Sequence, residues 1–150
     1  MLEDFQSVVI PVLFVAFVAM ILWLISRGWR ELAKIYPLTI PFTGERWYFQ
    51  TGEIAGGKYG YMLIIGGDLR GAYFSNSFPA ALCPRIFVPW EEIKGVEHRG
   101  ILVRYVQLEF LKAPQQVHSI SGRLADKLER ASGGIWNYQR ADKTVFFGKD

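Results

Sequence analysis

Residues 8–25 have the sequence VVIPVLFVAFVAMILWLI, in which no side chain is charged or strongly polar. In helical form, about 18 residues rise roughly 27 Å, close to the thickness of the hydrocarbon core of a bilayer. The run therefore predicts one helix that spans a membrane. A buried core helix is the alternative, but the rest of a 150-residue chain offers too little apolar surface to surround it.

The charges at the two ends of this run predict its orientation. Two acids, Glu3 and Asp4, precede it. Three cations follow it: Arg27, Arg30 and Lys34. Because Lys and Arg beside a span resist translocation, we expect the N-terminus outside the cell and the rest of the chain in the cytoplasm, held at the plasma (inner) membrane. A cleaved signal peptide is the other interpretation; no basic segment precedes the run, and no small-residue cleavage site follows it.

The organisation predicted from these features has three parts. Residues 1–36 form the anchor and a juxtamembrane helix, residues 37–134 a β domain, and residues 135–150 an aromatic tail. The juxtamembrane helix has an apolar side at helical spacing that we expect to bury against lipid headgroups or a partner, and Pro37 ends it. The expected membrane-interface residues are Trp23, Arg27, Trp29, Arg30 and Lys34.

The span itself limits the possible functions. It contains no ionisable or amide side chain, so it offers no proton or ion pathway and no imidazole for a haem or chlorophyll. We therefore expect no cofactor there. Bulky and small side chains alternate on it in a way that favours docking on another membrane helix, through Phe14, Ala16, Phe17, Ala19 and Met20.

From residue 38 onward, short β-type runs are separated by glycines and prolines. A helix with an apolar face is expected after them, capped by Ser121 and ended by Gly133 and Gly134. Gly66, Gly67 and Asp68 are expected to form a hairpin turn. The predicted strands are 46–51, 59–65, 69–75, 85–88, 93–98, 101–111 and 117–120.

About seven strands followed by one amphipathic helix resemble the pleckstrin-homology superfold, in which two antiparallel sheets form a partly open barrel that a helix plugs. The segment 82–93, LCPRIFVPWEEI, is similar to a stretch in uncharacterised membrane-anchored bacterial proteins of this kind. The resemblance implies a mainly β fold with one N-terminal transmembrane helix and a small antiparallel barrel closed by a C-terminal helix. Small antiparallel barrels of another topology are the alternative.

The sequence holds little that predicts chemistry. His98, His118 and Cys83 lie in separate elements, so neither a metal site nor a cysteine nucleophile is expected. The net charge of +3 is spread along the chain, which argues against nucleic-acid binding. In the first hairpin, Lys58 is offset by Glu53, which argues against specific binding of a phosphoinositide headgroup.

The expected function is therefore non-enzymatic. We expect a single-pass accessory or structural subunit that contacts membrane lipids and stabilises a larger integral-membrane complex, for example a respiratory or photosynthetic one, from its cytoplasmic side. A free-standing adaptor that binds peptide or lipid through its barrel is the alternative, and an enzyme is more distant. The tail is too apolar to be left in water, and either binds a partner or folds back on its own domain. Its candidate partner-binding residues are Trp136, Tyr138, Val145, Phe146 and Phe147.

Overall fold

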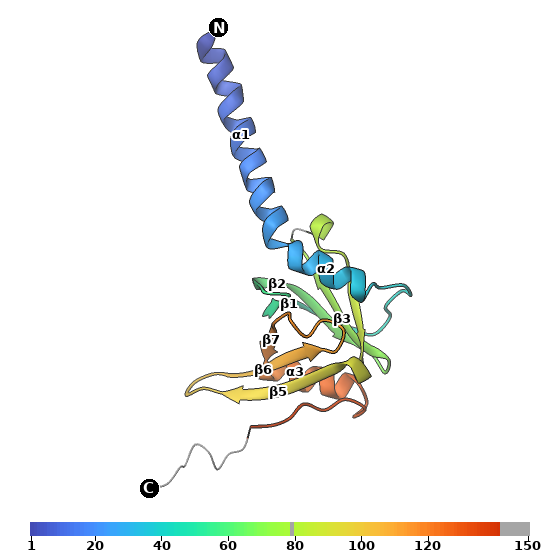
Figure 1. The fold of residues 1–150 in the computed structure, drawn as a ribbon. Coiled ribbons are helices and arrows are strands. Elements are labelled where there is room, and N and C mark those ends of the chain that lie inside the picture. Colours follow the sequence, from blue (N-terminus) through green and yellow to red (C-terminus); the bar gives the residue numbers. More distant parts are fainter. Residues whose placement is uncertain (79, 142–150) are drawn as a thin grey trace.

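The computed structural model describes residues 1–78 and 80–141. Within this part of the chain, an apolar N-terminal helix projects from a half-barrel of seven antiparallel strands, and a further helix follows the last strand (Figure 1). The predicted fold class, mainly β with an N-terminal apolar helix and a C-terminal helix, is confirmed.

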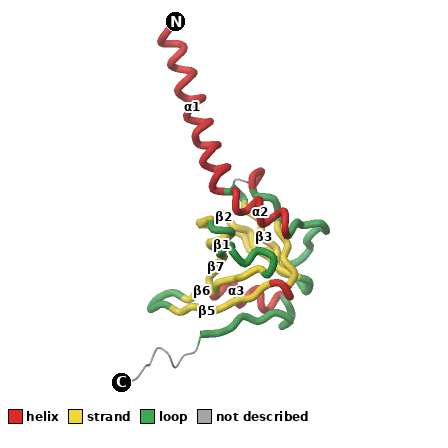
Figure 2. The backbone as a smooth tube through the Cα atoms, in the orientation of Figure 1, coloured by secondary structure: helices red, strands yellow, loops and turns green. Residues whose placement is uncertain are grey.

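Two separate helices lie within residues 1–36. α1 spans Leu2–Ile25 and α2 spans Arg27–Ile35, with Ser26 between them. No side chain of α1 is buried, and its length and composition suffice to cross a membrane, although a signal sequence meets the same criteria. α2 turns away from the axis of α1 and lies across the end of the half-barrel nearest to it (Figure 2).

The strands form one sheet in the order β4-β3-β2-β1-β7-β6-β5. β1 to β4 follow one another as neighbours, and β5 to β7 do the same. The two groups join where Gly52 and Glu53 of β1 pair with Ile120 and Ser119 of β7. The strand bounds are β1 Glu45–Ile54, β2 Gly57–Gly67, β3 Gly71–Asn76, β4 Ile86–Pro89, β5 Ile93–Arg99, β6 Arg104–Phe110 and β7 His118–Ser121.

Alternation explains how these strands build a core. In β6, Val106, Leu108 and Phe110 are buried while the residues between them are exposed, as expected for a half-buried strand. β6 begins at Arg104 and not at Ile101 as predicted. Residues 101–103 therefore belong to the hairpin turn between β5 and β6.

The turn predicted at Gly66, Gly67 and Asp68 starts later than expected. Both glycines lie inside β2, and the turn begins at Asp68, whose carboxylate accepts backbone N–H bonds from Arg70 at 2.7 Å and Gly71 at 3.1 Å. A Cβ at Gly66 would meet the Glu45 carbonyl at 2.5 Å. Close packing between strands therefore explains this glycine.

The C-terminal helix has the predicted form. α3 spans Gly122–Ala131, and the Ser121 hydroxyl accepts a bond from the Leu124 N–H at 3.2 Å. Gly133 and Gly134 then take φ of 66° and 83°, which favours glycine and ends the helix. Two short 3-10 turns, η1 (Ala80–Leu82) and η2 (Trp90–Glu92), flank β4.

The hydrophobic core is longer in sequence than the expected domain. It begins at Trp29 and Leu32 of α2 and ends at Trp136 and Tyr138, all of them buried. Segments assigned from the sequence to the juxtamembrane helix and the tail thus both pack on the half-barrel.

Candidate membrane and partner interfaces

The joint between α1 and α2 is held by side chains on both sides of Ser26. The Ser26 hydroxyl donates to the Leu22 carbonyl at 2.8 Å. The Arg30 guanidinium donates to the Ser26 hydroxyl at 2.6 Å and to the Trp23 carbonyl at 2.9 Å, so it links α2 to the end of α1. These bonds also satisfy carbonyl groups at the end of α1, which have no partner within the helix. They therefore fix the angle between α1 and α2.

α2 is part of the core of the half-barrel. Trp29 is fully buried, donates its indole N–H to the Pro84 carbonyl at 2.6 Å, and packs edge-on against Tyr59 with ring centroids 5.6 Å apart. At the other end of α2, the Tyr36 hydroxyl accepts the Lys112 N–H at 2.9 Å. The expectation that Trp29 lies at the membrane interface is therefore wrong, because the domain core encloses its ring.

Close backbone contact also fixes α2 in place. A side-chain carbon at Gly28 would collide with the carbonyl oxygen of Ala55, at the turn between β1 and β2. The Gln116 side-chain amide donates to the Gly28 carbonyl at 3.1 Å. Glycine at position 28 thus allows the helix to seat directly on the first hairpin.

The other four expected interface residues lie outside the core. Trp23 is 51% exposed, and the Arg30 guanidinium lies 4.8 Å from its ring centroid. Arg27 is exposed and pairs with Glu31 at 3.3 Å, and Lys34 is also exposed. The cations Arg27, Arg30 and Lys34 therefore follow the side of α2 opposite Trp29.

The five expected helix-packing residues are all exposed along α1. Phe14 is 66%, Phe17 55% and Met20 51% exposed, and Ala16 and Ala19 lie between them. Their availability agrees with helix docking, which stays a prediction.

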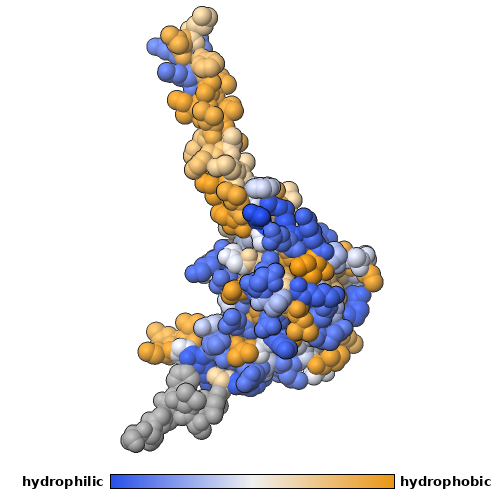
Figure 3. Space-filling view, viewed as in Figure 1, coloured by the Kyte–Doolittle hydropathy of each residue, from blue (hydrophilic) through white to orange (hydrophobic). Residues whose placement is uncertain are grey.

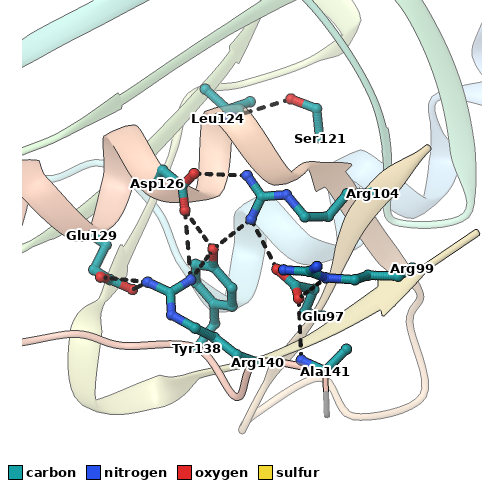
Figure 4. Close-up of polar contacts among 10 residues, drawn as sticks. All are labelled: Glu97, Arg99, Arg104, Ser121, Leu124, Asp126, Glu129, Tyr138, Arg140 and Ala141. Carbon is teal, nitrogen blue, oxygen red and sulfur yellow. Dashed lines mark hydrogen bonds and ion pairs between the residues drawn. The ribbon is translucent and has the colours of Figure 1, made fainter. Parts of the chain in front are cut away.

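At the opposite end of the half-barrel, a network of charges surrounds Arg104 (Figure 4). Its guanidinium donates to Glu97 at 2.8 Å, to Asp126 at 2.7 Å and to the Tyr138 hydroxyl at 2.9 Å. These bonds join β5, β6, α3 and the segment after α3. The network also includes Arg99, Glu129, Arg140 and the backbone N–H of Ala141.

Glu97 is the buried centre of charge in this network, with no exposed side-chain surface. Burial opposes its ionisation, but hydrogen bonds from Arg104 and Arg99 outweigh that cost and lower the pKa of its carboxyl to about 2. Three carboxylates face three guanidinium groups here. A network whose charges satisfy one another in this way stabilises a fold and leaves no group free for acid–base catalysis.

The network holds the first part of the tail. Trp136 stacks on Trp90 with centroids 5.5 Å apart and donates to the Ile93 carbonyl at 3.0 Å. Gln139 adds a short parallel bridge to β5, donating to Gly95 at 2.7 Å and accepting from Glu97 at 2.8 Å.

The tail residues expected to bind a partner separate into two groups. Trp136 and Tyr138 are each 4% exposed, so they are not a free partner surface; residues 135–141 instead fold back on their own domain. Val145, Phe146 and Phe147 lie outside the described residues.

A free apolar surface exists where the sequence analysis expected a strand. The tip of the β5–β6 hairpin carries Ile101, Leu102 and Val103, which are 100%, 93% and 65% exposed. Figure 3 shows this tip as an apolar patch that projects sideways from a largely hydrophilic domain. The signal in the sequence was Arg99-Gly100, a turn followed by three apolar residues.

A second feature that the sequence analysis missed is an irregular region in the middle of β1 and β2. The register between these strands shifts twice, and Phe49 and Tyr61 take φ of 55° and 59°. Both aromatic side chains are 76% exposed. Such backbone angles are unusual for aromatic residues, and no local sequence signal predicts them.

Of the three residues considered for chemistry, Cys83 and His118 are enclosed, whereas His98 is exposed on β5. Cys83 is buried, and burial raises the pKa of its thiol. His118 is fully buried, accepts the Ala55 N–H at Nδ1 and stacks on Phe110; burial lowers its pKa to about 4. In the described part of the chain, no three His, Cys, Asp or Glu side chains lie close enough to hold a metal ion.

These features define a class of protein: a seven-stranded antiparallel half-barrel fixed, through a short helix, to an apolar helix of membrane-spanning length. In comparisons with known proteins, neither a family model nor a curated sequence matches the chain.

Proposed function

We propose that this chain is a non-enzymatic, single-pass membrane protein that acts as an accessory subunit and stabilises a larger integral-membrane complex. The observation that supports this most is that one connected unit carries two separate exposed apolar surfaces. One is the apolar run 8–25 of α1, and the other is the hairpin tip at residues 101–103. A subunit that contacts a complex both within the membrane and beside it needs one apolar surface for each contact.

In the orientation we propose, the N-terminus lies outside and the half-barrel lies in the cytoplasm. The acids Glu3 and Asp4 precede α1, and the cations Arg27, Arg30 and Lys34 follow it. Introduced cysteines test this, because the native Cys83 is buried. In intact cells, an impermeant thiol reagent should label Ser7→Cys and spare Lys94→Cys; the reverse pattern would overturn the orientation.

We further propose that the half-barrel is pleckstrin-homology-like. Two antiparallel groups of strands, β1 to β4 and β5 to β7, are followed by a helix, which supports this assignment. In this chain the turn of the first hairpin packs against Gly28 of α2. This contact disfavours one form of the alternative, an adaptor that binds lipid headgroups through the first hairpin; an adaptor that binds peptide or lipid elsewhere on the barrel remains the second candidate.

Purification in mild detergent tests the accessory-subunit proposal. The tagged full-length chain should elute with other integral-membrane subunits in fixed ratio. Replacing Ile101, Leu102 and Val103 by asparagine should release them without unfolding the domain, because these side chains make little contact with the core.

Leu69→Asn is the matched control, since Leu69 is 66% exposed at another turn. It should leave the complex intact. A chain that elutes alone, or an assembly that survives the triple substitution, would contradict the proposed role of the hairpin tip.

A further inference from the structure

We infer that the outer side of α2 and the neighbouring η1 loop (Phe78 and Ala80–Leu82) form a membrane-contacting face, which holds the half-barrel against the phospholipid headgroups of the bilayer that α1 spans. This inference rests on the membrane span included in the proposed function. It adds a lipid-binding surface on the domain and a fixed orientation for the hairpin tip.

The position of α2 along the chain supports the inference first. The apolar run ends at Ile25, and α2 begins at Arg27. Two residues of helix advance only about 3 Å. The headgroup layer on each side of the hydrocarbon core is roughly 5–8 Å thick. When α1 spans the bilayer, α2 therefore begins within the headgroup layer.

The two sides of α2 then face different surroundings. Trp29, Leu32 and Ala33 are buried in the half-barrel. The opposite side presents a stripe at helical spacing: Arg27, Arg30, Glu31 and Lys34. Three cations against one acid match anionic phosphates, and the stripe is continuous with Trp23 at the end of α1.

The loop after β3 belongs to the same face. In Figure 1, its yellow-green 3-10 turn lies next to α2. The loop is tied to α2 because Trp29 donates to the Pro84 carbonyl at 2.6 Å. In this loop Phe78 is 56% exposed, and Ala80 and Ala81 are also exposed. An exposed phenyl ring next to α2 can insert at the boundary between lipid headgroups and acyl chains, where apolar side chains of interfacial segments are buried.

The joint at Ser26 makes the orientation specific. Arg30 bonds to both Ser26 and the Trp23 carbonyl, so the domain does not hang from a flexible linker. With α2 and the η1 loop on the bilayer, the β5–β6 hairpin lies on the part of the domain far from α2 and projects sideways, across the axis of α1 (Figure 1). Its apolar tip is then presented to a neighbouring protein and not to lipid.

Nitroxide labels in the full-length chain test the inference. In a Cys83→Ala background, single cysteines are placed at Val15 in α1, Ala81 in the η1 loop and Leu102 at the hairpin tip, and the chain is reconstituted in nanodiscs containing phosphatidylglycerol. Collisions with oxygen report lipid contact, and collisions with a water-soluble nickel chelate report water contact. We expect the label at position 81 to meet the nickel chelate several-fold less often than the label at 102, and the label at 15 to meet mainly oxygen.

A charge reversal sharpens the test. Arg27→Glu with Lys34→Glu should raise nickel access at position 81 toward that at 102, because the phosphates would repel the stripe. Lys94→Glu with Arg123→Glu, an equal charge change at exposed sites of the domain, should leave it unchanged.

The possible failures are distinguishable. Equal nickel access at 81 and 102, with position 15 still in lipid, would overturn the docked face and leave the membrane span intact. Water contact at position 15 would overturn the span, and the docked face with it.

Discussion

The two segments that flank the half-barrel, α2 and residues 135–141, both fold onto it, but different contacts hold them. The N-terminal end, α2, is held by burial of large side chains, with Trp29 and Leu32 fully enclosed. The C-terminal end, residues 135–141, is held by stacking of Trp136 and by the charge network around Arg104. Burial of apolar surface is not screened by salt, whereas ion pairs weaken as the salt concentration rises. The end nearest α1 therefore has the attachment less dependent on salt.

The largest effect is expected at the N-terminal end. Trp29→Ala should lower the free energy of unfolding by about 4 kcal/mol, because it leaves a cavity beside Tyr59 and the Pro84 carbonyl without its donor. Urea unfolding of the full chain in mild detergent, followed by near-ultraviolet circular dichroism, measures this. Trp23→Ala is the control, and a loss above about 1 kcal/mol there would mean that exposed Trp23 also supports the domain.

The attachment of residues 135–141 should weaken when Arg104, the central cation of the network, is replaced. Arg104→Met should cost about 3 kcal/mol, because Glu97 stays buried with Arg99 as its remaining cation. Arg140→Met removes a more exposed member of the same network and should cost less than about 1 kcal/mol. Equal losses in the two variants, measured by urea unfolding, would show that the network is not centred on Arg104.

Acid should weaken the N-terminal end first, in spite of its apolar character. His118, beneath the β1–β2 turn that α2 covers, has a pKa lowered from 6.5 to about 4 by burial. The unfolded chain thus binds this proton more tightly, and the stability is present above pH 6.5 and lost as the pH falls toward 4. Between pH 7 and pH 5, unfolding should become easier by about 2 kcal/mol.

A substitution at this histidine isolates its contribution. His118→Asn keeps an acceptor for the Ala55 N–H and does not titrate, so its unfolding free energy should be flat between pH 7 and 5. The Glu97 carboxyl has a pKa lowered from 4.5 to about 2, so the stability it provides is fully present above about pH 4.5 and is lost only below it. It therefore adds no slope between pH 7 and 5. A variant that keeps the wild-type slope would assign the slope to another group.

The sequence predicted the strands well because their alternation is local. Val106, Leu108 and Phe110 face the core as their spacing indicated. The same spacing identified the apolar side of α2, but periodicity states only that a side is buried. The spacing does not indicate whether lipid or protein covers Trp29. In the structure, the core of the half-barrel covers it.

The parts that were missed depend on contacts between distant segments. The Arg104 network draws on β5, β6, α3 and the tail, and no spacing along the chain relates these four. One signal was present: alternation in β5 places Glu97 on the same side as Ile93, which implies a carboxylate that needs buried partners. The positive φ at Phe49 and Tyr61 had no such signal.

The smallest effect is expected from the cap of α3, and it tests whether the two ends respond separately. Ser121→Ala removes one neutral hydrogen bond to the Leu124 N–H, which should cost about 1 kcal/mol, whereas Ser119→Ala on the same strand should cost less. α3 carries Asp126 and Glu129, the anchors of Arg140, so its first turn supports the tail. Amide exchange should then accelerate at Gln139, which bonds to Gly95, and stay unchanged at Phe87, which bonds to Tyr36 at the other end. Equal acceleration at both amides would show that the two ends unfold as one unit, and the contrast between them would not hold.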